Sequence, residues 1–271
     1  MQLLIPHRIS RIMTATVLAL LAAPTMEAQE IWPIMGERNY FRLEAMRSSF
    51  DDVEVDLANG IAEAALAISL GQRHRLSFSL PIARFSPSES SLSGSLVGNP
   101  YIGLDFGASS TGWYGQVGGR LPVASEDEAS ARFVGLFTDF DRAEAFILDV
   151  VSITTTLGYR HHESSGLTIG VRLGASGWIP SGDAAGDTEV LAHYGFRVGY
   201  DRQRAILGVG FTGRLLVTEE DAEDRATHQV AFDLAYRFDR VIPAVGLRLP
   251  LDEELSSDLN AVVIVALKLL W

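Results

Sequence analysis

Residues 260–271 read NAVVIVALKLLW and decide the fold class. Counted back from Trp271, every second position is apolar, and the positions between them carry the only charge, on Lys268. Alternation with a period of two is typical of a β-strand whose two faces meet different surroundings. The stretch therefore predicts a strand with one wholly apolar face and one mixed face.

A strand that is apolar on one side and ends in an aromatic residue resembles the closing strand of bacterial outer-membrane β-barrels. In those proteins the last aromatic residue belongs to the signal that the barrel-assembly machinery reads. Phe is usual at that position, so Trp271 is a small departure. The resemblance implies the assembly machinery as a partner through Trp271, and outer-membrane lipids and lipopolysaccharide as surroundings.

The N-terminal residues agree with export. His7, Arg8 and Arg11 precede an apolar run over residues 12–23, and small residues lead to Ala28. The run is too short to span a bilayer and has the layout of a secretory signal peptide. We predict cleavage after Ala28, with residues 29–38 as a periplasmic or lumenal segment. Residues 39–271 are then one barrel in the outer membrane.

Composition narrows the class further. Hydrophobic residues make up 47% of the chain and the mean hydropathy is +0.16, too polar for a helical membrane protein. Barrels show such values because only one face of each strand meets lipid. The absence of cysteine excludes disulfides and thiolate chemistry, and a net charge of −12 argues against nucleic acid as a partner. The sequence predicts no cofactor.

Amphipathic stretches recur along the chain, and the connections between them alternate between short and long. Short turns in the periplasm and long loops outside are typical of a transmembrane, antiparallel, up-and-down β-barrel of about twelve strands, an all-β fold. A soluble β-sandwich is the alternative. The strands are expected at 39–48, 60–70, 75–84, 97–107, 112–123, 145–160, 166–178, 188–200, 204–217, 226–238, 241–250 and 260–271.

The polar face of these strands is expected to line a lumen. Its charged side chains either select anionic or hydroxylated solutes in a pore, or pair across strands and fill the lumen. The predicted lumen-lining residues are Arg42, Glu44, Glu63, Asp105, Arg120, Arg160, Arg172, Glu189, His193, Arg197, Arg214, Asp233, Arg237, Arg248 and Lys268.

Aromatic residues on the apolar face gather at strand ends beside the short turns. Such residues form the girdle of a barrel at one membrane interface. The predicted periplasmic girdle consists of Phe106, Trp113, Tyr159, Tyr200, Phe238 and Trp271.

The long loops are acidic, which predicts a solvated rim. Divalent cations that bridge these loops to lipid phosphates are the alternative, although no run has the spacing of a calcium loop. The acids are Asp51, Asp52, Glu54, Asp56, Glu126, Asp127, Glu128, Asp139, Asp141, Asp183, Asp187, Glu219, Glu220, Asp221, Glu223, Asp224, Asp252, Glu253, Glu254 and Asp258.

The segment 162–166, HESSG, resembles the H-x-S-x-G motif of outer-membrane phospholipases. That resemblance implies Ser164 as nucleophile and His162 as base. The chain departs from the pattern because it has no Asn between Asn99 and Asn260 to orient the histidine. The segment also falls in an expected periplasmic turn, so we predict ordinary hairpin chemistry and no enzyme activity.

Residues 98–105, GNPYIGLD, are similar to a stretch of an outer-membrane family named for the meta-pathway of phenol degradation. The resemblance covers one strand and implies a channel for small, aromatic compounds. We therefore expect a passive channel for small solutes, anionic or aromatic. The alternatives are a closed structural or adhesive barrel, and a lipid hydrolase that uses His162 and Ser164.

Overall fold

The computed structural model describes residues 39–50, 60–86, 93–107, 111–181, 186–218, 226–256 and 259–271. The predicted signal peptide and the segment 29–38 lie outside these residues and stay predictions. The same holds for the acidic residues within 51–59, 182–185, 219–225 and 257–258.

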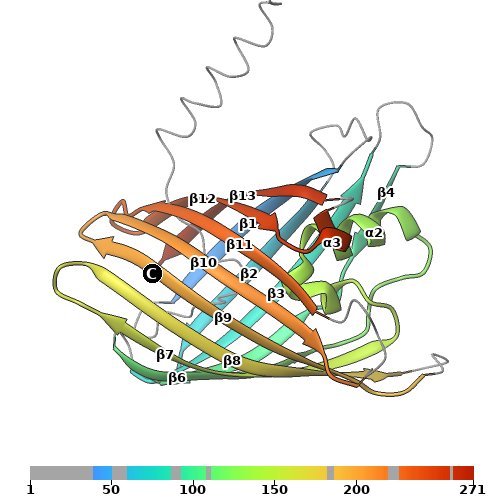
Figure 1. The fold of residues 1–271 in the computed structure, drawn as a ribbon, viewed down its shortest axis with the longest axis horizontal. Helices are drawn as coiled ribbons and strands as arrows, with labels where there is room; N and C mark the ends of the chain where they lie inside the picture. The colour runs from blue at the N-terminus through green and yellow to red at the C-terminus, as the bar shows by residue number, and fades with distance from the viewer. Residues whose placement is uncertain are drawn as a thin grey trace, which may run out of the picture.

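The strands close into an antiparallel barrel (Figure 1). β1 (Tyr40–Phe50) pairs with β13 (Leu259–Leu270) on one side and with β2 (Gly60–Ser69) on the other, and β2 pairs with β3 (His74–Phe85). The remaining wall runs through β4 (Gly94–Val97), β5 (Tyr101–Gly107), β6 (Gly112–Arg120), β7 (Val150–His162), β8 (Leu167–Pro180), β9 (Glu189–Arg202), β10 (Ala205–Leu216), β11 (Ala226–Tyr236) and β12 (Val241–Pro250).

β4 and β5 both pair with β3, so they are two halves of one wall strand. The described strands therefore make a twelve-stranded up-and-down barrel, as predicted. The expected single strand 97–107 is wrong in detail, because the wall breaks at residues 98–100.

The apolar face of the last strand lies outside the barrel. Val263 and Val265 are each 53% exposed, whereas Val262 and Ile264 are 2% and 3% exposed. A soluble sandwich would bury its apolar face and expose its polar one. The reverse arrangement confirms the barrel and excludes the sandwich. None of the described helices is long and apolar enough to cross a membrane.

Tight turns join the strands at the end where Trp271 donates its backbone N–H to the carbonyl of Asn39. Two of them contain residues with positive φ, Gln203 at 55° and Asp239 at 50°, and Gly166 has φ 104° in the turn between β7 and β8. These are the predicted short turns. The long connections all leave the opposite end of the barrel, which is the extracellular end in the predicted topology.

One long connection folds inward. Residues 121–149, here called the insert, contain α2 (Ala129–Thr138) and the 3₁₀ helix η1 (Phe140–Ala145). Figure 1 shows α2 within the end of the barrel from which the long connections leave. Two predicted strand bounds were therefore wrong: the strand expected over 112–123 ends at Arg120, and the one expected over 145–160 begins at Val150. A short helix, α3 (Glu253–Ser256), lies between β12 and β13.

Candidate functional site: the lumen and its insert

The insert docks on the barrel wall through a small apolar core centred on Phe146, which is fully buried. A Cβ atom at Gly135 would lie 2.5 Å from the Phe146 ring, and one at Gly98 would lie 2.8 Å from it. The ring therefore fits between α2 and the wall only because both positions are glycine. Met46 and Ile264 belong to the wall side of this core.

Asn99 ties both ends of the insert to the break between β4 and β5. Its side-chain amide donates to the carbonyl oxygens of Glu144 and Ile147, at 3.0 and 2.7 Å. Its side-chain oxygen accepts from the backbone N–H groups of Val123 and Ala124, at 2.8 and 3.0 Å. Asn99 has 0% exposure, and its buried side-chain amide has hydrogen-bond partners on both its nitrogen and its oxygen. These bonds fix the first and last residues of the insert against the wall. The GNPY stretch is thus where the wall opens to hold the insert.

An ion-pair cluster holds the middle of the insert. Arg142 of η1 is 1% exposed and bonds Glu44 and Glu63 of the wall, each at 2.7 Å, as well as Asp139 within the insert. Arg42 of β1 adds a second contact to Glu63, at 2.6 Å. A buried guanidinium shared by three carboxylates is stable only while all partners stay together. The insert is therefore docked by charge as well as by Phe146.

A second group of contacts reaches across to β10 and β12. Arg248 binds Asp139 at 3.1 Å. Arg214 binds the Glu144 carboxylate at 3.0 Å and the carbonyl of Phe140 at 2.7 Å. The insert is therefore held by strands on both sides of β13, since α2 itself packs against β1 to β4.

The position of Asp139 and Asp141 corrects one prediction. We expected both in the solvated acidic rim, but their side chains are 2% and 7% exposed inside the lumen. Burial alone would raise the pKa of Asp139, and the guanidinium groups of Arg142 and Arg248 outweigh it and hold that pKa below its ordinary value. The positive charges of the arginines in the lumen stabilise acidic side chains there, which is why these two aspartates lie inside the barrel. Glu126 and Asp127, in the same connection, are exposed as expected.

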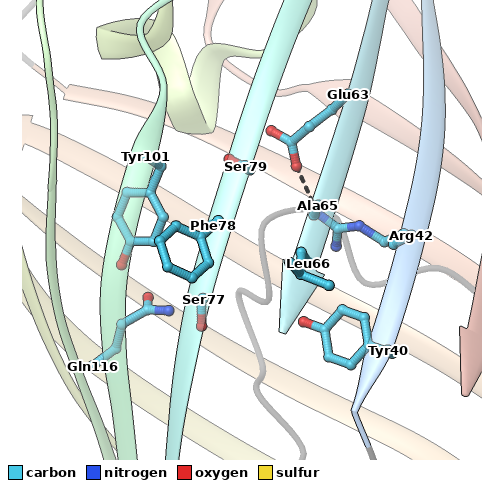
Figure 2. Close-up of a pocket in the computed structure, with 10 residues that line it drawn as sticks. All are labelled: Tyr40, Arg42, Glu63, Ala65, Leu66, Ser77, Phe78, Ser79, Tyr101 and Gln116. Atoms are coloured by element: carbon cyan, nitrogen blue, oxygen red, sulfur yellow. Dashed lines mark hydrogen bonds and ion pairs between the residues drawn. The ribbon is translucent and has the colours of Figure 1, made fainter. Parts of the chain in front are cut away.

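Below the insert, on the side of the short turns, the lumen contains a small cavity of about 30 Å³ (Figure 2). Ala65, Ser77 and Ser79 leave this space because their side chains are small, and the rings of Tyr40 and Tyr101 flank it. The Arg42–Glu63 pair forms its edge, and Glu63 also holds Arg142. The volume admits about two water molecules. The cavity therefore adjoins the contacts that anchor the insert.

The wall over β7 to β9 differs, because two of its threonine hydroxyl groups bond to nearby strands of the wall. Thr154 and Ser176 share a hydrogen bond of 2.9 Å, and Thr156 bonds His193 at 3.0 Å. Nearer the short turns, Arg197 pairs with Asp233 at 2.5 Å. The main contacts of α2 with the wall are those with β1 to β4.

The side chains predicted to line the lumen all lie on its inward side, since each falls on the buried register of its strand. Arg42, Glu44, Glu63, Asp105, Arg120, His193, Arg197, Arg214, Arg248 and Lys268 are buried. Arg160, Arg172, Glu189, Asp233 and Arg237 are half-buried. Their role in selecting solutes stays a prediction.

Sequence reasoning missed three charged residues of this interior: Arg75, Arg142 and Glu144. Arg75 binds Asp105 at 2.8 Å and shares the inward register of β3 with Ser77. Strict alternation along 74–85 is the signal that places it inside. Arg142 and Glu144 lie in the insert, where no strand period applies.

The predicted girdle residues lie on the outer face near the short turns. Trp113 is 63% exposed, and its ring meets that of Tyr159 edge-on, with centroids 5.4 Å apart. Phe106, Tyr200, Phe238 and Trp271 are 40–54% exposed. Their positions fit an aromatic belt at one interface.

The candidate hydrolase residues are not arranged as a catalytic pair. His162 ends β7, where its backbone bonds the hydroxyl of Thr111, and Ser164 is exposed in the following turn. No hydrogen bond joins His162 to Ser164 among the described contacts. Nor do the described residues contain a group of three or more acidic or histidine side chains able to hold a metal ion.

No protein-family model and no curated relative matches the chain. Solved structures do. The COG4313 outer membrane channel from Pseudomonas putida F1 is 14% identical with a TM-score of 0.62, and the match covers 91% of this chain and 100% of that one. LpxR from Salmonella typhimurium is 9% identical with a TM-score of 0.52, covering 86% and 100%. At such identities the likeness concerns the fold, and that fold is the bacterial outer-membrane β-barrel.

Proposed function

We propose that this protein is an outer-membrane channel for small solutes, which opens when the insert leaves the lumen. One observation carries the proposal: a loop segment, the insert, folds into the lumen and is held there by buried contacts with the wall. A barrel with a purely structural role needs no removable filling. The likeness to an outer membrane channel in fold supports this reading over an enzyme.

The charges of the insert indicate the class of solute. Its buried side chains bring three carboxylates into the lumen, Asp139, Asp141 and Glu144, and one guanidinium, Arg142. Together these four side chains carry a net charge of −2. When the insert leaves, the lumen therefore becomes more positive by two charges. Arg214 and Arg248 lose their partners and face the path. The open channel should favour anionic solutes, since a fixed charge beside an ion path controls selectivity.

A reversible cross-link tests the role of the insert directly. The Ser48 hydroxyl of β1 lies 2.8 Å from the Thr138 hydroxyl of α2, and the chain has no cysteine. The Ser48→Cys/Thr138→Cys variant should therefore form a disulfide that locks the insert. Oxidised protein in planar bilayers should show no conductance steps, and reduction should restore the behaviour of the unmodified barrel. Each single cysteine variant is the control.

A deletion separates the channel from the closed barrel. A folded variant with a short Gly-Ser linker in place of residues 125–146 should give large conductance steps with a reversal potential that favours anions. If it inserts into bilayers and passes no ions, the closed barrel is the better interpretation. Release of fatty acid from lipid by the intact protein, abolished in Ser164→Ala, would instead support the hydrolase.

A further inference from the structure

A polar cluster interrupts the apolar outer face near the extracellular ends of β9 to β12. It consists of Tyr194 of β9, Phe211 of β10, His228 of β11 and Asp252, which follows β12. His228 Nδ1 lies 2.7 Å from Asp252 Oδ1, and His228 Nε2 lies 2.6 Å from the Tyr194 hydroxyl. The second oxygen of Asp252 accepts the backbone N–H of His228. Nothing in the lumen uses these side chains.

The strand register builds this cluster. Gly213 of β10 is the direct partner of both Tyr194 and His228, so the three lie in one row across the outer wall. A Cβ atom at Gly213 would lie 2.5 Å from the Tyr194 ring. Glycine there lets the ring lie across β10 and reach the imidazole. Phe211 stacks on the imidazole, with centroids 5.6 Å apart and planes 22° apart, and its centroid is 6.3 Å from that of Tyr194.

The hydrogen bonds determine what the cluster offers to a ligand. When the imidazole is neutral, the Asp252 carboxylate accepts from Nδ1–H, which leaves Nε2 as the acceptor of the Tyr194 O–H. Every donor proton is then used inside the cluster. The phenol oxygen keeps a free lone pair, and its acceptor strength rises because its own proton is donated. The cluster thus offers acceptors, one negative charge and three ring faces, and the His228 and Asp252 side chains are still 28% and 19% exposed.

We propose that this cluster binds the ammonium end of a phosphoethanolamine headgroup in the outer leaflet. An ammonium group supplies the N–H donors that the phenol and carboxylate oxygens lack, and it binds favourably over aromatic faces. The cluster lies at the extracellular ends of the strands, and Leu251 beside it donates its backbone N–H to the carbonyl of His228. Headgroups meet the wall at this level. An anionic headgroup would be repelled by Asp252 and find no free donor.

This inference is independent of conduction and needs only the barrel in a membrane. Native mass spectrometry of the full-length protein tests it, with lipids of equal acyl chains that carry ethanolamine, choline or glycerol headgroups. The ethanolamine lipid should be retained at least about threefold more than the glycerol lipid. Lipid A with and without a phosphoethanolamine group distinguishes a modified lipopolysaccharide from a glycerophospholipid as the source.

Two variants and one control identify the site. Tyr194→Phe keeps the ring and removes the phenol oxygen, and Asp252→Asn keeps a hydrogen bond to His228 and removes the charge. Both should abolish the preference for ethanolamine. Tyr200→Phe, an outward tyrosine of the same strand at the opposite end, should keep it. If the contacts of Asp252 only held the loop after β12 in place, neither variant would change the headgroup preference.

Three results would overturn the proposal: no headgroup preference, a preference unchanged in both variants, or equal retention of choline and ethanolamine lipids. Equal retention of the two lipids would show that the ammonium N–H donors, which choline lacks, do not contribute to binding. If Asp252→Asn fails to fold, as judged by heat-modifiable gel mobility, Tyr194→Phe decides the question, since it disturbs no packing.

Discussion

The two sides of the lumen use similar residues in different ways. On the β1–β3 side, polar groups of the wall reach into the insert: Glu44 and Glu63 bind Arg142, and Ser48 binds Thr138. On the β7–β9 side, polar groups bind their neighbours in the wall, as Thr154 binds Ser176. The first side binds the insert through charged and hydroxyl groups, and the second has hydrogen bonds between its own strands. This difference indicates that the insert is docked mainly on the β1–β4 side of the wall.

The largest effect is expected from Arg142→Ala. It leaves Glu44, Glu63 and Asp139 buried without their shared cation, which costs about 3–5 kcal/mol. The insert should leave the lumen, and conductance should rise in planar bilayers while protease cleaves within residues 121–149.

Arg132→Ala is the matched control, since Arg132 lies half-exposed on the same insert and binds no carboxylate within the described contacts. It should leave both readouts unchanged. Equal behaviour of the two variants would mean that ion pairs do not dock the insert.

A smaller loss is expected from Asn99→Ala, which frees both ends of the insert at once. The change leaves two backbone carbonyls and two backbone N–H groups without partners, and we expect a cost of about 2–3 kcal/mol. Protease sensitivity within the insert should rise, while the melting of the barrel itself stays near that of the unmodified protein. Asn260→Ala, at an exposed position of β13, is the control.

The wall was predictable from the sequence, and the insert was not. Along residues 260–271 one face must meet lipid and the other must not, so alternation alone places each side chain. The break at residues 98–100 overrides the strand period because Asn99 satisfies backbone groups from a segment far along the chain. No local pattern encodes that partner.

A signal for the insert was nevertheless present. Residues 124–146 contain one glycine and no proline, which is unusual for a long surface loop. Ala131, Val134 and Thr138 repeat at helical spacing and are buried in α2. The pairing of Asp139 with Arg142 also has helical spacing. What the sequence lacks is any indication that this helix enters the lumen, since that depends on the volume that twelve strands enclose.

The hydroxyl groups allow a direct comparison of the two sides. Ser48→Ala removes a bond between wall and insert and should weaken docking by about 0.5–1.5 kcal/mol. Thr154→Val removes a bond within the wall and should leave docking unchanged. Docking in the two variants can be compared by the rate at which a cysteine at wall residue 46 cross-links to a cysteine at insert residue 145. A loss of docking in Thr154→Val would show that the β7–β9 wall also carries the insert.

The smallest effect is expected from pH. The pKa of Asp139 is depressed in the folded protein by Arg142 and Arg248, against the opposing effect of burial. A depressed carboxyl pKa gives a stabilisation that is fully present above the unfolded value, about 3.9, and is lost as pH falls through the folded value. Protease sensitivity of the insert should therefore be the same at pH 7 and pH 5 and rise only below about pH 4. Asp139→Asn should remove this acid transition, because amide and carboxylate have the same shape and only one titrates. An insert that already leaves the lumen between pH 7 and pH 5 would contradict the assignment of Asp139 as its charged anchor.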